Sequence, residues 1–319
     1  MSLIDSIKYK IELMYHFLYC FDRQYIKQGS VSIYSLLESV QEKITIHIIS
    51  DLSEQEIEVP RKIIQHKNLN KINFYQIYFP ELNLYNLEEA HVTEATFYRM
   101  FIENHLSFDD YVTYLDCDVL CINNPIPSIN KVIFELEQSD RFISFNTELN
   151  SDDGYSYFTD LNLKGKRYFN AGVMIFNLES WNKFKIKEKL IEIIPKVKDK
   201  AIFWDQDILN IIFDDNYFEL PNSLNSRNRN LKEENIELHH FSGKYKPWSI
   251  NGAKQKYADE FHQYYYSLYK KRYFIVVPNI HNGLNHLKVF IKNIKPKDIK
   301  KDLLLVLYTI IGILKSFRK

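Results

Sequence analysis

Two carboxylates stand two residues apart inside an apolar stretch near the middle of the chain. The segment from Tyr111 to Leu120 has the composition of a strand, yet it contains Asp116 and Asp118. Burying an unpaired carboxylate is costly, so a cation is expected here. Side chains two apart project to the same side of an extended chain, which lets both carboxylates bind one hard divalent ion. The alternative is a pair of exposed loop residues or helix caps.

A step of small and polar residues opens a second apolar segment. Asn170, Ala171 and Gly172 precede the apolar residues that lead to Leu178. Small residues let a ligand approach the backbone, and the Asn170 amide both donates and accepts hydrogen bonds. This pattern is typical of a binding site beside a strand, although an ordinary turn would have the same pattern.

Two polar residues stand at the start of a later helical pattern. Asp205 and Gln206 come shortly before Ile208, where apolar residues begin to recur. Asp205 is either catalytic or the N-cap of this helix. Capping does not account for Gln206, so we take it as a second catalytic candidate.

A late segment combines a metal ligand with groups that bind phosphate. His240 supplies a borderline nitrogen ligand, which together with two carboxylates suits Mn²⁺ better than Ca²⁺. Gly243 and Lys246 can approach a phosphate through a backbone N–H and an ammonium group. The alternative is a surface loop closed by the aromatic ring of Trp248.

The elements that must position these residues alternate between strands and helices. This β-α-β-α-β order favours a parallel sheet covered by helices, with ligands beyond the carboxyl ends of the strands. No G-x-G-x-x-G or P-loop pattern occurs, so a dinucleotide site or a P-loop NTPase is not supported. The hydrophobic periodicity predicts strands at Leu13–Cys20, Ile44–Ile49 and Lys71–Ile77, and helices at Gly29–Val40 and Glu54–His66.

The charge is divided unevenly along the chain. The 319 residues carry 41 basic and 41 acidic side chains, but twelve of the basic ones and only two acidic ones fall between Lys270 and Lys319. The remaining body is therefore acidic, which argues against a core that binds nucleic acid. With 45% apolar residues the chain can bury a sizeable core, which excludes a disordered polymer.

The cysteine content and the N-terminus favour a cytoplasmic location. Three cysteines are too few for a disulfide scaffold, and Cys117 and Cys121 lack the second ligand pair that a zinc site needs. Charged residues between Asp5 and Glu12 interrupt any signal sequence.

The C-terminal region predicts a helix that lies on a membrane surface. The apolar run from Leu303 to Leu314 is twelve residues long. As a helix it spans about 18 Å, against roughly 30 Å of hydrocarbon in a bilayer, so it cannot cross. Lysines and an arginine flank it, as in helices that bind anionic lipid. A helix that packs on the core or forms a dimer is the alternative.

Taken in order, the motifs resemble family 8 of the retaining glycosyltransferases, which includes bacterial lipopolysaccharide galactosyl- and glucosyltransferases and the glycogenins. The resemblance extends from about Leu13 to Trp248, and each motif is weak alone. The matching segments are Asp22 with Tyr25, Thr96–Arg99, Leu115–Leu120, Phe169–Trp181, Asp205–Asn210 and His240–Trp248.

The resemblance implies an α/β fold of the GT-A type, with a Rossmann-like mixed sheet flanked by helices and a basic helical tail. It places the catalytic domain at residues 13–250. The residues that follow predict a helical, basic region at 251–319, with the membrane-surface helix at 300–319. The resemblance also implies roles for individual residues. Metal binding falls to Asp116, Asp118 and His240, donor binding to Asp22, Tyr25, Arg99, Asp116, Cys117, Asn170, Ala171, Gly243 and Lys246, and catalysis to Gln206 and Asp205.

The expected activity is transfer of glucose or galactose from a UDP-sugar to a bacterial surface glycan, with Mn²⁺ or alternatively Mg²⁺. Retention would proceed by front-face attack, because the Gln206 amide is a poor nucleophile. Alternatives are a protein glycosyltransferase that modifies an adhesin or itself, and an idle nucleotide-sugar-binding protein. One segment has no firm match in the family, so the identity of the acceptor cannot be inferred from the resemblance. This segment contains Asn146, Glu148, Asp152, Asp153 and Tyr155. The expected partners are the UDP-sugar, a glycan or glycolipid acceptor and an anionic membrane surface at the inner face of the cell membrane.

Overall fold

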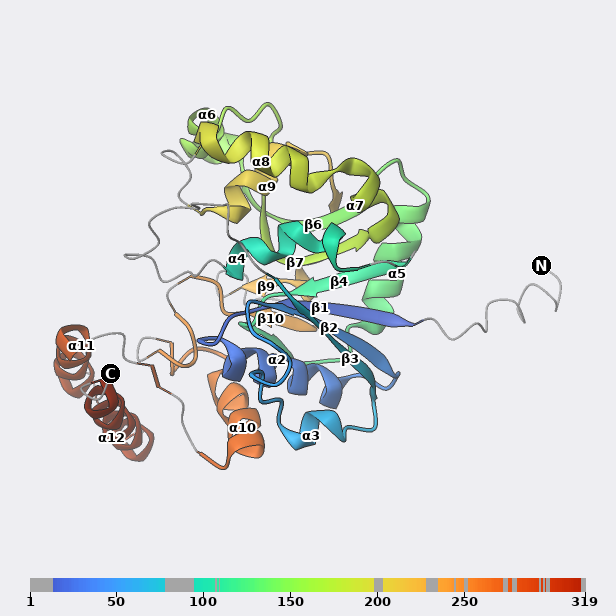
Figure 1. Cartoon of the computed structure of the whole chain (residues 1–319). Coiled ribbons are helices and arrows are strands. Elements are labelled where there is room, and N and C mark those ends of the chain that lie inside the picture. The colour runs from blue at the N-terminus through green and yellow to red at the C-terminus, as the bar shows by residue number, and fades with distance from the viewer. Residues whose placement is uncertain are drawn as a thin grey trace.

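The computed structural model describes residues 14–77, 95–106, 108, 110–197, 203–227, 235–243, 245–249, 252–271, 275–276, 280–292, 294, 296 and 299–316 (Figure 1). The strands are β1 (Tyr15–Cys20), β2 (Ile44–Ser50), β3 (Leu69–Gln76), β4 (Tyr111–Leu115), β5 (Val119–Cys121), β6 (Ile143–Asn150), β7 (Arg167–Asn177), β8 (Phe218–Glu219), β9 (Ser226–Arg227) and β10 (Leu238–His240). The helices are α2 (Ile26–Ser39), α3 (Arg61–Ile64), α4 (Ala95–Tyr98), η2 (Arg99–Asn104), α5 (Ile126–Glu137), η3 (Ser151–Asp153), α6 (Tyr157–Asp160), α7 (Leu178–Phe184), α8 (Ile186–Val197), α9 (Asp205–Phe213), η4 (Asn222–Leu224), α10 (Ala258–Tyr269), α11 (Ile280–Lys292) and α12 (Ile299–Ser316).

The central sheet is mixed. Its strand order is β3-β2-β1-β4-β7-β6-β8. The first four strands pair in parallel, whereas β7 is antiparallel to both β4 and β6. The parallel half confirms the order predicted from the alternating strands and helices, and the antiparallel half gives the mixed sheet that the resemblance implied. A second sheet, β5-β10-β9, has three strands.

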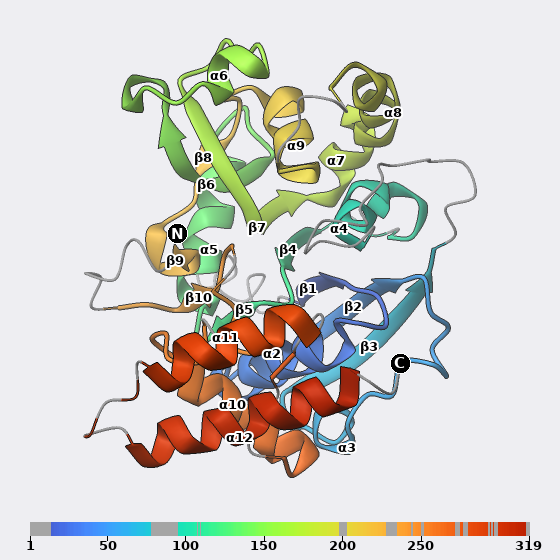
Figure 2. The same cartoon turned by 90° about the vertical axis from the view of Figure 1, so that its left-hand side faces the viewer.

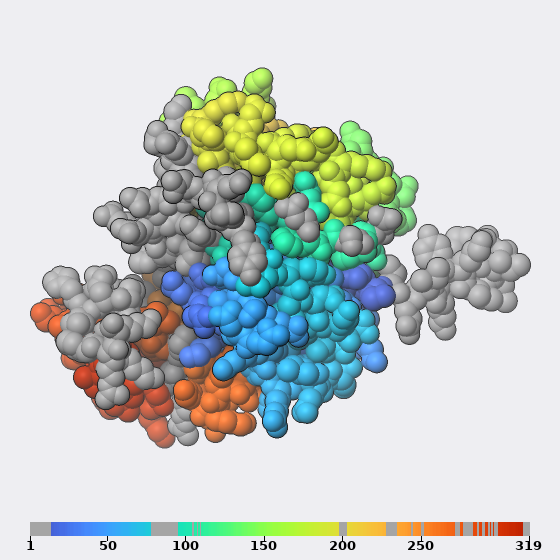
Figure 3. All heavy atoms as spheres, in the orientation of Figure 1, coloured from blue at the N-terminus to red at the C-terminus, as the bar shows by residue number. Residues whose placement is uncertain are grey.

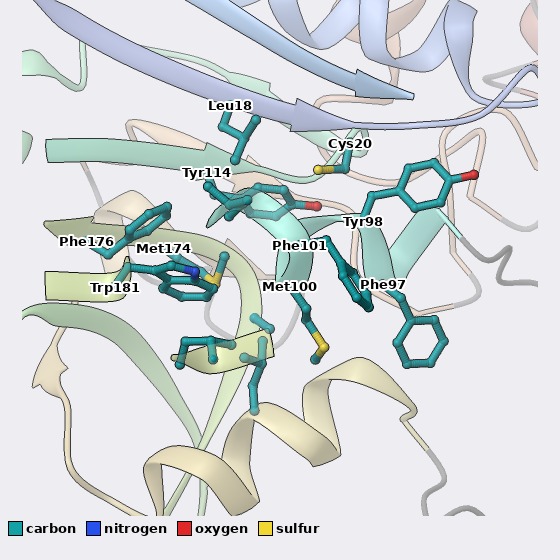
Figure 4. Packing of buried hydrophobic residues seen from close by; sticks show 14 of the residues in the cluster. Leu18, Cys20, Phe97, Tyr98, Met100, Phe101, Tyr114, Met174, Phe176 and Trp181 are labelled. Atoms are coloured by element: carbon teal, nitrogen blue, oxygen red, sulfur yellow. The ribbon is translucent and has the colours of Figure 1, made fainter. Parts of the chain in front are cut away.

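Helices cover both faces of the central sheet because its strands are apolar on both sides. In β1, Phe17 and Tyr19 belong to the core under α2, α3 and α5, whereas Leu18 and Cys20 face α4, η2 and α7 to α9. This alternation is the two-residue period of a strand. Figure 4 shows the second core from close by, and its labelled side chains are Leu18, Cys20, Phe97, Tyr98, Met100, Phe101, Tyr114, Met174, Phe176 and Trp181.

Two local predictions were wrong. The helix predicted at Glu54–His66 is reduced to α3, which begins only after Pro60. Proline disfavours helical geometry in the residue before it, so the helix cannot extend further back. The apolar run to Leu120 is not one extended strand, because β4 ends at Leu115 and the chain turns through Asp116–Asp118 before β5. The residue Leu13 lies outside the described part of the chain.

The last three helices lie together at one edge of the molecule, and α11 and α12 pack against each other (Figure 2). Figure 3 shows them, orange to red, beside the blue and cyan atoms of residues 14–77. Leu305 of α12 packs with Ala253 and Ile275, and buried Asp302 forms an ion pair with Lys254. The predicted helix at 300–319 is therefore present as α12, while residues 317–319 lie outside the described residues. None of the helices in the described residues is both long and apolar enough to span a bilayer.

Candidate active site

Three ligand atoms converge where the two sheets meet. The ligand atoms of Asp116, Asp118 and His240 all lie within 4.8 Å of one another. His240 Nε2 is 3.3 Å from Oδ1 of Asp118 and 3.8 Å from Oδ2 of Asp116. The turn after β4 supplies the carboxylates, and β10 supplies the histidine because it pairs antiparallel with β5, which places His240 opposite Val119. The alternative of exposed loop residues is wrong, because Asp118 and His240 are buried.

The amides behind His240 set the orientation of its ring. The backbone N–H of Gly172 donates to Oδ1 of Asn170 (3.1 Å), and that oxygen also accepts a hydrogen bond from Nδ2 of Asn225 (3.1 Å). Oδ1 of Asn225 therefore faces Nδ1 of His240 at 3.1 Å, which must carry the proton. Nε2, the other ring nitrogen, faces the two carboxylates.

These atoms fit a divalent cation. Oδ1 of Asp118 is buried and has no hydrogen-bond partner among the described residues. A histidine nitrogen and two carboxylates form a ligand set of the kind that binds Mn²⁺ or Zn²⁺. With an ion bound, Asn225 would be the outer partner that orients the histidine ligand.

A buried arginine fixes one of the carboxylates. Arg99 donates to Oδ1 of Asp116 (2.8 Å), its Nε lies 3.1 Å from Oδ2 of Asp205, and its guanidinium stacks on the ring of Tyr114. The Tyr114 hydroxyl also donates to Oδ1 of Asp116 (2.6 Å). Burial alone would lower the pKa of Arg99, but the two carboxylates raise it above its ordinary value. Oδ1 of Asp116 is thus held, and Oδ2 is turned toward His240.

Asp205 is not a helix cap. It is the first residue of α9, and Trp204 occupies the cap position. Its Oδ1 accepts a hydrogen bond from the Thr96 hydroxyl (2.5 Å), and Arg99 lies beside Oδ2. Burial raises the pKa of Asp205 to about 6 despite the opposing charge of Arg99. The carboxylate is therefore already committed to contacts within the protein.

The Gln206 side chain is held at both ends. Its Oε1 accepts hydrogen bonds from Nδ2 of Asn170 (3.1 Å) and from the backbone N–H of Ala171 (3.2 Å). Its Nε2 donates to the hydroxyl of Tyr168 (3.1 Å). Asn170 and Ala171 lie inside β7 and not before a strand or in a turn, contrary to both sequence interpretations. A chain of amides thus leads from His240 through Asn225 and Asn170 to Gln206.

Hydrogen bonds within the loop after β1 hold its conformation. Oδ1 of Asp22 accepts hydrogen bonds from the backbone N–H groups of Gln24 (2.8 Å) and Tyr25 (3.3 Å), so this carboxylate shapes the turn into α2. Tyr25 packs edge-on against Trp248, with ring centroids 6.2 Å apart. Burial raises the pKa of Tyr25, and the negative charge of Asp118 adds to this effect.

The remaining predicted residues are Lys246, Gly243 and Cys117. The ammonium of Lys246 bonds Oδ2 of Asp118, and although burial alone would raise the pKa of Asp118, Lys246 lowers it below its ordinary value. Gly243 has a φ of +69°, which an L side chain rarely adopts. The Cys117 thiol is buried and points toward the carbonyl of Cys20 (3.7 Å), so only its backbone remains for a ligand.

The structure therefore connects most of the predicted site residues by direct contacts. Asp116, Asp118, His240, Arg99, Asp205 and Lys246 form one charged cluster, and Asn170, Ala171 and Gln206 form the amide group beside it. Sequence reasoning missed Asn225, which is fully buried. The signal for it was slight: a lone asparagine between Leu224 and Ser226 in a short segment without helical or strand periodicity.

Comparison with known proteins agrees with this geometry. The family model for glycosyl transferase family 8 matches residues 16–252. The chain is 28% identical to general stress protein A of Bacillus subtilis, over 80% of this chain and 94% of that protein. It is also 28% identical to a lipopolysaccharide 1,2-glucosyltransferase of Escherichia coli, over 76% of each, and 27% identical to a lipopolysaccharide 1,3-galactosyltransferase of Salmonella typhimurium, over 75% and 74%.

Among solved structures, the fold matches galactosyltransferase LgtC in complex with donor and acceptor sugar analogs. The TM-score is 0.67 at 22% identity, covering 80% of this chain and 96% of that one. The glycosyltransferase GlyE of Streptococcus pneumoniae gives a TM-score of 0.59 at 19% identity, covering 79% and 60%. Since the family model spans most of the chain, and the fold and the carboxylate–histidine cluster agree with it, this protein belongs to glycosyltransferase family 8.

Proposed function

We propose that this enzyme is a retaining hexosyltransferase that moves glucose or galactose from a UDP-sugar to a bacterial surface glycan such as lipopolysaccharide or lipooligosaccharide. The observation that carries the proposal is the convergence of acceptor atoms from Asp116, Asp118 and His240 beside the fixed amide of Gln206. The substrate class is supported by two relatives that are lipopolysaccharide hexosyltransferases by name.

Asp116, Asp118 and His240 would hold the divalent ion, for which one nitrogen and two oxygen ligands favour Mn²⁺, with Mg²⁺ as the alternative. When bound, the ion would neutralise charge that develops on the leaving diphosphate. Lys246 would add to this effect, because its ammonium can exchange Asp118 for a diphosphate oxygen when the donor is present.

The other donor contacts are assigned according to which part of each residue a ligand can use. We assign the uridine to Asp22 and Tyr25, the latter offering a ring next to Trp248 for stacking. Cys117 contributes through its backbone, since its thiol is buried in the core. Gly243 contributes a backbone N–H in a conformation that suits glycine. Arg99 acts on the donor mainly by fixing Asp116.

The transferred sugar is assigned to Asn170, Ala171, Asp205 and Gln206. The Asp205 carboxylate accepts a hydrogen bond from Thr96 and forms an ion pair with Arg99. These contacts support an orienting role for Asp205 and not that of a nucleophile. Gln206 has an amide, a poor nucleophile, and its three hydrogen bonds suit it to hold the sugar in one orientation. We therefore favour front-face attack, in which a donor phosphate oxygen takes the proton of the acceptor hydroxyl.

Release of UDP from a panel of nucleotide sugars tests the proposed function. With Mn²⁺ present, we expect UDP release from UDP-glucose or UDP-galactose, and loss of that release when EDTA removes the ion. GDP- and CMP-linked sugars serve as controls for the base. Binding of UDP-sugars without any release, in the presence of lipooligosaccharide acceptor, would instead support the idle nucleotide-sugar-binding alternative.

We also propose that residues 251–319 form a region separate in task from the catalytic part at 13–250, and that it holds the enzyme on the inner face of the membrane. One face of α12 is buried through Asp302, Leu305 and Ile313. The opposite face is exposed and apolar. We call this set the α12 stripe: Leu303, Leu307, Ile310 and Leu314.

The α12 stripe has the chemistry of a lipid-binding surface. Its spacing of three and four residues is that of one helix face. Lys288 and Lys292 of α11, which packs against α12, and Lys300 of α12 itself are exposed and can meet anionic headgroups. The other face of the helix packs on Ala253, as the core-packed interpretation expects. The membrane-facing interpretation that we propose concerns the α12 stripe alone.

Replacing Leu303, Leu307 and Leu314 with serine is expected to reduce flotation with vesicles rich in phosphatidylglycerol by more than about tenfold, because each leucine gives up about 1 kcal/mol of apolar contact with lipid. The matched control is the triple serine variant at exposed Ile64, Phe134 and Ile191. Equal flotation of the two variants would refute the role of the stripe. Persistence of binding on uncharged vesicles would refute the role of the lysines.

A further inference from the structure

Two charged residues that the proposed chemistry does not use lie on the far side of Asn170 from the metal cluster. Glu148 is in β6 and Arg227 is in β9. Oε2 of Glu148 lies 3.2 Å from Nη1 of Arg227 and 3.3 Å from Nδ2 of Asn170. Glu148 is therefore one hydrogen bond from Asn170 and two from Gln206, both of which we assign to the transferred sugar.

The arginine of this pair is rigidly held. Only 6% of the Arg227 side chain is exposed. Its Nη2 donates to Oδ1 of Asn146 (2.7 Å) and to the carbonyl of Thr147 (3.2 Å), and Asn146 in turn donates to the carbonyl of Leu220 (2.9 Å). A buried guanidinium is costly unless a carboxylate pairs with it. Arg227 is thus both neutralised by Glu148 and able to fix the position of Glu148.

Only one oxygen of Glu148 is used in these contacts. Oε2 takes both, whereas Oε1 forms no hydrogen bond within the described part of the chain. About a fifth of the Glu148 side chain is open to solvent, at 21%, so a ligand can reach it. An ionised carboxylate only accepts hydrogen bonds, and its bonds to a donor are strong because of its charge. The hydroxyl groups of a sugar are donors of this kind.

We propose that Glu148, positioned by Arg227, binds a hydroxyl of the transferred hexose and helps to select which sugar the enzyme uses. This rests on the proposed function, because it takes the sugar next to Asn170 and Gln206 to be that of the donor. Glu148 is then a specificity residue, whereas Arg227 acts through it. Neither residue was assigned a role from the sequence, because β6 and β9 meet only in the folded protein.

Monodeoxy donors combined with a Glu148 variant test this assignment. We expect the wild type to show a kcat/KM about 10- to 100-fold lower for one of the 2-, 3-, 4- and 6-deoxy analogues of its UDP-hexose, by the loss of one charged hydrogen bond. Glu148→Ala should lower kcat/KM for the parent donor by a similar factor and abolish the discrimination against that one analogue. A residue with a merely structural role would lower turnover of every donor alike.

Two further variants make the result decisive. Because Glu148→Ala leaves the charge of Arg227 buried, the double variant Glu148→Ala with Arg227→Met is measured as well, and it should show the same lost discrimination. Glu219→Gln is the control, since Glu219 pairs with Arg167 at 3.2 Å but is 45% exposed, and discrimination should be unchanged. The proposal is overturned if both Glu148 variants still discriminate against that deoxy donor. It is also overturned if the variants lose discrimination against a deoxy acceptor and keep it for the donors. A wild type that releases no UDP from any donor contradicts the proposed function itself.

Discussion

Asp116→Asn is expected to abolish Mn²⁺-dependent release of UDP, lowering kcat by about 10³-fold or more, since stabilising the charge on the leaving group usually contributes most to the rate of such reactions. Asparagine keeps the shape of the side chain but removes its charge. Oδ2 of Asp116 faces His240, whereas Oδ1 accepts from Arg99 and Tyr114. The variant therefore loses a charged ligand to the ion and also loosens the group that orients it.

Two measurements separate these effects from misfolding. Titration with Mn²⁺, followed by the electron paramagnetic resonance signal of the free ion, should show weaker binding by Asp116→Asn whether or not a substrate is present. Asp110→Asn is the matched control, because Asp110 directly precedes the same strand at its other end. Turnover by Asp116→Asn equal to that of the wild type would end the metal assignment.

Gly172→Ala should disable the site through a single methyl group. A Cβ at this position would lie less than 3.0 Å from Cε1 and Nδ1 of His240 and from Oδ2 of Asp116, closer than real Cβ contacts occur. Since the backbone N–H and carbonyl of Gly172 are bonded to Asn170 and Asp116, the strand cannot easily move away. His240 must shift instead, and it then loses its hydrogen bond to Asn225.

The expected result is a fall in Mn²⁺ affinity of about 10- to 100-fold, the range seen when the orientation of a ligand is lost, and a fall in turnover at least as large. The free energy of unfolding should drop by about 1–3 kcal/mol because of overpacking. Gly154→Ala is the control: its φ of +76° makes alanine unfavourable, but no atom lies within 4 Å of the added Cβ. It should lose stability and keep Mn²⁺ affinity. Unchanged metal binding by Gly172→Ala would contradict the geometry of the cluster.

Much of the parallel half of the sheet was predictable because its signals are local. Strand β1 pairs with β2, and β2 pairs with β3, so these strands have neighbours that follow each other in the chain. The composition of each segment favours a strand. The exception, residues 54–60, shows how one residue decides a local structure. Apolar spacing predicted a helix there, but Pro60 set where α3 begins.

The chemistry of the carboxylates was also visible in the sequence, although their geometry was not. Two aspartates in an apolar segment predicted a cation because burial of unpaired charge is costly, and the fold brings a histidine to them. The extended conformation we expected was wrong, since Asp116 and Asp118 lie in a turn between two sheets. That turn still directs both carboxylates to one point.

The sequence by itself determined the residue types that bind charge, the strands of the parallel half of the sheet and the family to which the chain belongs. The tertiary structure alone decided which of them meet. Asn225, Glu148 and Arg227 have no local pattern, because their partners lie on strands far away in the chain. Periodicity depends on sequence neighbours only, whereas the distance from His240 to Asp118 depends on how β10 pairs with β5 and on how tightly Gly172 lets β7 approach them.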